Sequence, residues 1–428
     1  MTLPVKYYAN TMQGAPQLTN DWGCMTALLD AVLITGFNLK TIDTLTSLNG
    51  VATASIPAGH LYQVGQVLNI SGADQAEYNG EVRVISTTTS AFTYAITGAP
   101  VSPATGASIA VKVAPLGWEI AFTGTNKRAY RSKNVVSNRP YLRVDDSRDP
   151  AYDTSYAKKA KVTMAQGMSD IDTYVGARAP FDPANPHQNE NSTGTGNGVV
   201  DGWYKWYYAK AGGNSHDEYG PAAYNRPWVL IGDDRGFYIF NEGTDSGGLG
   251  GKCFTDFESY RSADGFNTLL CAQDAYIHAA GYASQLDGEG YQSADWRSRF
   301  PRTLDGMGKV LMRSFLQIGN NVNPSFTSLN TNNAQTTSGF STGISWPNGP
   351  DYSMILHPTL LRETTHLRGK MPGLFWVHND SPGFNNLDTI TGVAGYPGRT
   401  FLLVKVAHGV GGGNYTATLA FDVTGPWW

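Results

Sequence analysis

The stretch that decides the fold class lies near the N-terminus. Residues 51–113 read VATASIPAGHLYQVGQVLNISGADQAEYNGEVRVISTTTSAFTYAITGAPVSPATGASIAVKV. Valine, isoleucine, threonine and alanine recur along five short runs, and turn dipeptides such as Asn79-Gly80 separate them. Such alternation is typical of strands with one buried face. The block from about residue 46 to residue 113 therefore predicts a small β module, a barrel or a sandwich.

A helix is expected ahead of this module. Residues 22–36, WGCMTALLDAVLITG, place apolar residues at helical spacing. Asn20 or Asp21 is suited to cap the start of the helix and Gly36 to end it. We expect residues 1–45 to form an N-terminal segment with this amphipathic helix. A hypothesis that follows is that the segment docks the protein onto a larger particle.

Residues 114–428 are expected to form a large β-rich, sandwich-like domain. Strand patterns occur in PYLRVDD, KVTMAQGMSDID, GLFWVHND, RTFLLVKVA and TLAFDVT, and RPWVLIGDDRGFYIFNE predicts a hairpin. Two polar stretches, at 183–225 and 318–350, are expected to be long loop insertions, which usually carry function or disorder. The predicted fold class is thus mainly β.

Composition excludes several classes of protein. Of the 428 residues, 15% are charged and 41% hydrophobic, and the net charge is −4. This balance gives no electrostatic footprint for nucleic acid, and no apolar run is long enough to span a membrane. Cys24, Cys253 and Cys271 are far apart in the sequence and predict neither a disulfide framework nor a metal motif. Synthesis in a reducing cytoplasm is the simplest interpretation.

Two motifs suggest enzyme chemistry but lack its context. The run 339–343, GFSTG, matches the G-x-S-x-G nucleophile elbow, with His408, Asp380 and Asp388 as partners. That motif needs a strand before the serine, whereas a polar Asn/Thr stretch precedes it here. The run 247–252, GGLGGK, departs from the phosphate-binding loop at two positions. We expect no catalytic residue and no cofactor.

Metal and acid–base patterns are looser still. Histidines near carboxylates lack metal-ligand spacing, so no metal site is expected. The histidines and carboxylates in question are His187, His216-Asp217-Glu218, and His357 with Glu363 and His366 on a possible short helix. Acidic pairs across an aromatic groove would suit glycoside hydrolysis, whereas aspartates in turns are the favoured interpretation. The acidic clusters are Asp145, Asp146, Asp149 and Asp153, then Asp170 with Asp172, and Asp233 with Asp234.

Seven aromatic residues are candidates for an interface or a ligand contact. Exposed aromatic side chains at chain ends would favour aggregation, so they are expected in a core or a subunit contact. The aromatic run WYKWYY could also stack on sugar rings. Intramolecular burial stays open as an alternative for each of them. The candidates are Tyr7, Tyr8, Trp203, Trp206, Tyr207, Trp427 and Trp428.

The β module resembles a small module that is common in proteins of tailed bacteriophages. The matching pieces are Gly59-His60, GQVLNISGA at 65–73, Tyr78-Asn79-Gly80 and Phe92-Thr93-Tyr94. The flanks resemble an uncharacterised family of phage and prophage virion structural proteins. They include VKYYANTMQGAP, LLDAVLITGF, KVAPLGWEIAFTGTNKRAYRS, GMSDIDT, RPWVLIGDDRGFYIF, FTDFESYRSADGFNTLL, DTITGVAGYPGRTFLLV and FDVTGPWW. The resemblance covers most of the chain outside the two polar insertions.

The resemblance implies a structural component of a tailed-phage virion, in the tail, the neck or collar, or the baseplate. The implied partners are other virion proteins and copies of the same chain in a symmetric homo-oligomer. The implied localisation is the virion, after synthesis in the host bacterial cytoplasm. Three alternatives stay open: a tail protein that binds a host-surface glycan, a capsid decoration protein, and a polysaccharide-degrading enzyme.

Overall fold

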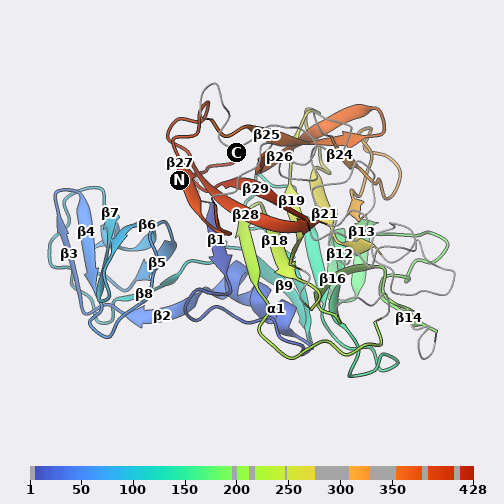
Figure 1. Ribbon diagram of the computed structural model, residues 1–428, viewed down its shortest axis with the longest axis horizontal. Coiled ribbons are helices and arrows are strands. Elements are labelled where there is room, and N and C mark those ends of the chain that lie inside the picture. Colours follow the sequence, from blue (N-terminus) through green and yellow to red (C-terminus); the bar gives the residue numbers. More distant parts are fainter. Residues whose placement is uncertain are drawn as a thin grey trace.

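Antiparallel strands dominate the structure, so the predicted fold class is confirmed. Within the described residues, strands form four large sheets and one two-stranded ribbon (Figure 1). The computed structural model describes residues 5–194, 200–211, 217–245, 248–274, 308–327, 353–377, 384–408 and 415–428. The G-x-S-x-G match at 339–343, Asp380, His216 and the start of the glycine-rich run at 247 lie outside the described residues.

The module is a seven-stranded antiparallel sheet in the order β2-β8-β5-β6-β7-β4-β3. Its strands are β2 Phe37–Thr41, β3 Thr44–Leu48, β4 Val51–Ser55, β5 Val67–Ser71, β6 Gly80–Thr87, β7 Ala91–Ala95 and β8 Ala110–Val113. The five strands expected from the alternating pattern are present. The sheet also includes β2 and β3, so the expected boundary at residue 46 falls inside β3. Only Leu45 of β3 is buried, which leaves no alternation to detect there.

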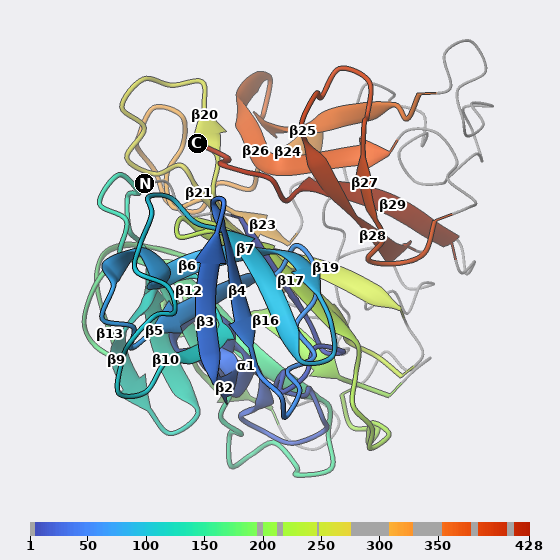
Figure 2. The same cartoon turned by 90° about the vertical axis from the view of Figure 1, so that its left-hand side faces the viewer.

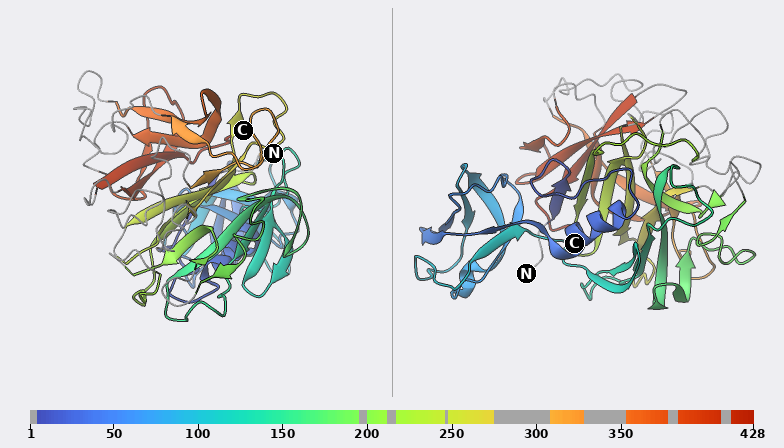
Figure 3. Two further views of the ribbon diagram at one scale, coloured as in Figure 1. Left: turned by 90° about the vertical axis from the view of Figure 1, so that its right-hand side faces the viewer. Right: turned by 90° about the horizontal axis from the view of Figure 1, so that it is seen from below.

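The module projects from the rest of the protein (Figures 1 and 3) and faces the viewer in Figure 2. Strand β1, Lys6–Ala9, fastens it to the body. Lys6 pairs with Glu81 on β6 and donates a hydrogen bond to the Pro115 carbonyl. Arg83, also on β6, donates to the Val5 carbonyl at 3.0 Å. These contacts add to the apolar cluster that the module shares with the body.

The predicted helix is present and lies in the core. It runs as α1 from Cys24 to Leu29 and continues as a π-helical turn from Asp30 to Thr35. Its side chains Met25, Leu28, Leu29, Val32 and Leu33 are buried. The N-terminal segment thus packs within the protein. Deleting residues 1–40 would remove core elements, which makes that deletion unsuitable as a test of docking.

A six-stranded sheet lies at the centre, in the order β1-β17-β18-β19-β21-β23. Its further strands are β17 Trp228–Gly232, β18 Gly236–Glu242, β19 Leu249–Asp256, β21 Thr268–Cys271 and β23 Lys309–Val310. The predicted hairpin is therefore confirmed as β17 and β18. Leu230 and Ile239 point into one apolar core, whereas Val229 and Phe240 point into another. Burial of both faces explains why this stretch reads as nearly continuous apolar sequence.

A second body sheet has the order β22-β16-β12-β11-β10-β9, and β13 also pairs with β12. Its strands are β9 Glu119–Gly124, β10 Lys127–Arg131, β11 Tyr141–Asp145, β12 Lys158–Asp170, β13 Thr173–Ala179, β16 Tyr204–Ala209 and β22 Gln273–Asp274. Strand β16 corrects the sequence analysis. The aromatic run at 203–208 was expected in a surface loop, yet 204–209 is a buried interior strand because β12 and β22 pair on its two sides.

The C-terminal sheet has the order β24-β25-β26-β29-β28-β27, with β20 also paired to β26. Its strands are β20 Glu258–Ser259, β24 Ser325–Thr327, β25 Leu356–Glu363, β26 His366–Val377, β27 Thr389–Thr391, β28 Thr400–His408 and β29 Tyr415–Asp422. His357, Glu363 and His366 lie on the β25–β26 hairpin, so the short helix considered for them is wrong. Among the described residues, none of the helices has the length and apolar character needed to cross a membrane.

Candidate functional site

One face of the second body sheet carries charged side chains. On β12, Val162 faces the apolar core, whereas Lys159 and Lys161 alternate with it and point to the other side. The register places Lys161 opposite both Asp145 on β11 and Lys205 on β16. Residues directly opposite in antiparallel strands share a face. All these charged side chains are nonetheless buried, because Glu190, Asp201 and Asp217 from other segments lie against them.

We call the four buried lysines below, together with the two aspartates that pair with them from the covering segments, the lysine–aspartate network. It comprises Lys159, Lys161, Lys205, Lys210, Asp201 and Asp217.

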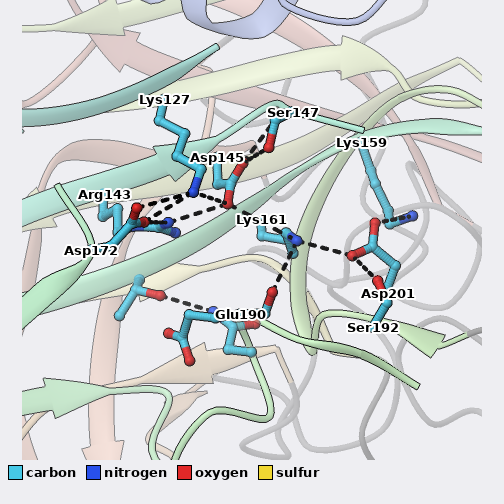
Figure 4. A network of polar contacts seen from close by, with 12 residues as sticks. Lys127, Arg143, Asp145, Ser147, Lys159, Lys161, Asp172, Glu190, Ser192 and Asp201 are labelled. Atoms are coloured by element: carbon cyan, nitrogen blue, oxygen red, sulfur yellow. Dashed lines mark hydrogen bonds and ion pairs between the residues drawn. The ribbon is translucent and has the colours of Figure 1, made fainter. Parts of the chain in front are cut away.

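Asp201 holds the covering ribbon of β14 (Ser192–Thr193) and β15 (Val200–Asp201) against the sheet. Its carboxylate oxygens lie 2.9 Å from Lys161 Nζ and 3.2 Å from Lys159 Nζ (Figure 4). Ser192 Oγ also donates to it at 2.8 Å. Burial alone would raise the pKa of Asp201, but the two ammonium charges hold it well below its usual range. Asp201 is therefore ionised and holds the β14–β15 ribbon against β12 through Lys159 and Lys161.

Asp217 is a second buried carboxylate that pairs with lysines of the network. Lys210 Nζ lies 2.6 Å from its carboxylate, Tyr207 Oη donates to it at 2.8 Å, and Lys159 Nζ lies 3.7 Å away. Burial opposes ionisation, yet the charges of Lys210 and Lys159 lower the pKa of Asp217 far below its usual range. A carboxylate held so strongly as an anion is a poor general acid at neutral pH.

Lys205 is the unmatched member of the network. Its side chain is fully buried, and Nζ has no hydrogen-bond partner in the described part of the chain. Burial, followed by repulsion from Lys159, lowers the pKa of Lys205 to about 7. The network thus contains four amines and two carboxylates, and Asp145 adds a third carboxylate 4.0 Å from Lys161 Nζ. One amine that releases its proton near neutrality reduces this excess of positive charge.

Asp145 and Asp146, one candidate acidic pair, have separate structural roles. Asp145 lies 3.2 Å from Arg143 Nη2 and accepts from the Ser147 backbone at 3.1 Å. Asp146 is buried at the start of α1, where Met25 N donates at 2.8 Å and Tyr208 Oη at 2.6 Å. Burial raises the pKa of Asp146 to about 7, although those hydrogen bonds oppose the shift. Asp145 thus stabilises the end of strand β11, and Asp146 accepts hydrogen bonds from the first backbone amides of α1.

Asp233 and Asp234, the other pair, shape the β17–β18 turn. Asp233 accepts from the backbone of Arg235 at 2.8 Å and from Trp428 Nε1 at 2.7 Å. Burial raises the pKa of Asp233 to about 6. Asp234 accepts from Asn134 Nδ2 at 3.1 Å. These contacts agree with the interpretation of the aspartates as turn residues.

The candidate aromatics fall into two groups. Tyr8, Trp206 and Tyr207 are buried, so the alternative of intramolecular burial describes them. Trp206 Nε1 donates to the Cys271 carbonyl at 2.9 Å, and Tyr8 Oη donates to the Ala114 carbonyl at 2.7 Å. Tyr7 and Trp203 are half-buried and pack against an apolar core. An external contact stays a prediction for these half-buried side chains and for the half-buried Trp427 and Trp428.

The last two residues close over the body. Trp427 Nε1 donates to the Asp422 carbonyl at 2.8 Å, and its ring packs edge-on against Tyr238. Trp428 lies under the Arg235 guanidinium, 3.8 Å from the ring centroid. Both indoles are half-buried. They tie the C-terminal sheet to the central hairpin, so intramolecular packing accounts for much of their surface.

Exposed apolar side chains gather on the module. It carries seven of the sixteen large hydrophobic side chains that are exposed in the described residues. Leu48, Val51 and Val101 form what we call the hairpin end. Leu48 pairs with Val51, and Tyr78 Oη bonds both Ser47 Oγ and the Val101 carbonyl, which brings Val101 beside them.

The opposite group, which we call the loop end, comprises Leu39, Leu61, Val64 and Ile85. The Asn38 amide donates to the His60 carbonyl at 2.9 Å, which joins the segments that carry Leu39 and Leu61. Gly65 N donates to the Val84 carbonyl at 2.9 Å, which sets Val64 near Ile85. Both ends thus present leucine and valine to solvent.

Sequence reasoning missed the lysine–aspartate network. Its signal was present, since lysines alternate with apolar residues in KKAKVTM and WYKWYYAK. That pattern normally indicates a solvated face, and the covering residues come from elsewhere in the chain. Among the described residues, no group of three or more His, Cys, Asp or Glu side chains is arranged to hold a metal ion.

Comparisons with known proteins give little. No family model matches the chain, and no curated protein matches it. Among solved structures, the phage phi92 endosialidase is similar at 12% sequence identity and a TM-score of 0.18, over 91% of this chain and 70% of that one. A likeness this weak establishes neither a common fold nor a common activity.

Proposed function

We propose that this protein is a structural subunit of a tailed bacteriophage particle, in its tail, neck or baseplate. The sequence resemblance supports this proposal. The observation that carries it is the projecting module with leucine and valine exposed at both ends. Exposed apolar groups of this kind mark surfaces that a partner covers. The partner we propose is a neighbouring protein of the particle, with an apolar surface of its own.

The interior of the body supports a structural role. The buried carboxylates of Asp201 and Asp217 are paired with lysines, and those of Asp146 and Asp233 bind backbone amides, so they fix segments to sheets. Its aromatic strand β16 lies inside the protein and packs the core. Such an arrangement provides rigidity without requiring a ligand.

Immunogold electron microscopy of purified particles tests the location. Antibody against the recombinant protein should label the neck, tail or baseplate, and mass spectrometry should find the chain in the particles. Label over the head would favour a decoration protein. Particles that lack the protein in both measurements would contradict the proposal.

Paired substitutions test the module. Leu48→Asp with Val101→Asp alters the hairpin end, and Leu61→Asp with Val64→Asp alters the loop end. Burying an unpaired carboxylate in an apolar contact costs several kcal/mol, so at least one pair should lower incorporation into particles by about tenfold or more. Val135→Asp is the matched control, because Val135 is also exposed but lies outside the module.

Incorporation is measured against the thermal midpoint of each purified variant. A variant with an unchanged midpoint and reduced incorporation supports the role of that end. Normal incorporation of both pairs would show that the module ends do not make the contact. The immunogold result would still test separately whether the protein is part of the particle.

A further inference from the structure

Two cysteines that are 18 positions apart in the sequence are direct neighbours in the central sheet. Strands β19 and β21 pair antiparallel, and Cys253 stands opposite Cys271. Both thiols are free and buried, with exposures of 0% and 2%. The spacing of the two cysteines along the chain does not indicate this proximity, so the sequence alone predicts no disulfide framework. The pairing of β19 with β21 places Cys253 and Cys271 side by side.

The positions suit a disulfide without movement of the strands. Opposite residues in an antiparallel pair have Cα atoms about 4.5 or 5.5 Å apart, and disulfides span about 4.4–6.8 Å. Their side chains share one face of the sheet, and both belong to the same apolar core. The two thiols already hydrogen-bond to each other. Side-chain rotation is thus the main change that a bridge requires.

The surroundings of the two thiols slow their reaction with oxidants in the folded protein. Burial raises the pKa of the Cys253 thiol well above its usual value, although the nearby Lys309 ammonium opposes the shift. Lys309 stands opposite Cys271 on β23. A protonated and buried thiol reacts slowly with oxidants. Oxidation therefore proceeds through opening of the sheet or during folding.

We propose that Cys253 and Cys271 form an intramolecular disulfide when the protein meets a low-molecular-weight disulfide such as oxidised glutathione. One cysteine thiolate attacks the oxidant, forms a mixed disulfide and releases one glutathione thiolate. The second cysteine thiolate then attacks the protein sulfur of the mixed disulfide and releases the second glutathione. The protein loses two protons and two electrons, and the oxidant becomes two thiols.

The bridge would close the chain segment between β19 and β21. That segment contains β20, whose Glu258 pairs with Lys370, and Asp264, which lies 3.1 Å from Arg368. Both partners belong to the C-terminal sheet. A covalent link at its base would reinforce the joint between the central and C-terminal sheets. This inference does not depend on the proposed virion role.

The experiment compares the bridge in folded and unfolded protein. Full-length protein is equilibrated with reduced and oxidised glutathione, once while refolding and once in concentrated denaturant. Free thiols are then alkylated, and peptide mass spectrometry quantifies the three possible pairings. The denatured sample is needed because a short intervening segment favours the same pair by chain proximity alone. The fold should raise the effective concentration of the Cys253–Cys271 pair by about tenfold or more over the unfolded chain.

Variants complete the test. Cys24→Ala should form the same bridge, because Cys24 lies away from the pair, against Thr19. Cys253→Ala should form no intramolecular bridge and should show no rise in thermal midpoint on oxidation, whereas oxidised wild-type protein should show one. Equal or lower bridge formation in the folded protein, or bridges that mainly involve Cys24, would overturn the proposal.

Discussion

Replacing Lys205 with methionine should stabilise the protein. Lys205 is fully buried, and its amine has no hydrogen-bond partner among the described residues. Methionine keeps a similar length and removes the group whose charged form is disfavoured there. A buried charge without a partner destabilises the folded state, and an apolar residue of similar volume relieves that cost.

The size of the effect follows from the pKa. The pKa of Lys205 falls from 10.5 to about 7 on folding, mainly through burial. The unfolded chain binds the proton below 10.5, whereas the folded chain binds it only below about 7. Burial of Lys205 therefore costs no stability above pH 10.5, where the amine is neutral in both states. The cost grows as the pH falls from 10.5 towards 7. The cost is about 5 kcal/mol at pH 6, about 3 kcal/mol at pH 8 and about 1 kcal/mol at pH 10.

The assay is urea unfolding of wild-type protein and Lys205→Met at several pH values, followed by tryptophan fluorescence. The gain in free energy of unfolding should shrink steadily as the pH rises from 7 to 10. Lys133→Met, at an exposed position, should show no such trend. Lys161→Met should destabilise the protein instead, since it removes a partner of Asp201. A Lys205→Met variant that is less stable at pH 7, or equally shifted at every pH, would refute the reasoning.

Three further substitutions test other parts of the structure. Asp201→Asn should cost about 3–5 kcal/mol in urea unfolding because it removes the carboxylate nearest to the buried ammonium groups of Lys159 and Lys161, and an unchanged free energy of unfolding would contradict this role of Asp201. Gly373→Ala should lower the thermal midpoint, since φ is +60° and a Cβ would clash with the Trp427 indole; an unchanged midpoint with unchanged indole fluorescence would count against the packing. Asp146 has a folded pKa of about 7, above its unfolded value of 3.8, so its contribution is complete below pH 3.8 and is lost as the pH rises through 7. Asp146→Asn should flatten the stability profile between pH 4 and pH 7, which unfolding at matched pH values would reveal.

Local sequence patterns determined much of the secondary structure. Alternation identified five strands of the module, and the glycine-rich turn between apolar runs identified the β17–β18 hairpin. Helical spacing located the segment that becomes α1. These signals are local because a strand or helix that buries one face must repeat apolar residues at its own period. β3 escaped prediction because one buried leucine makes no period.

The tertiary structure decided what the patterns left open. The strand 204–209 read as part of a surface loop because its burial depends on pairing with β12 and β22, which lie far away in the sequence. The burial of the β12 lysines depends on Glu190, which lies 29 positions after Lys161, and on Asp217, which lies 58 positions after Lys159. Cys253 and Cys271 became neighbours through strand register alone. In each case the deciding contact joins distant segments, and the free energy of burying a charge or a thiol depends on that contact rather than on adjacent residues.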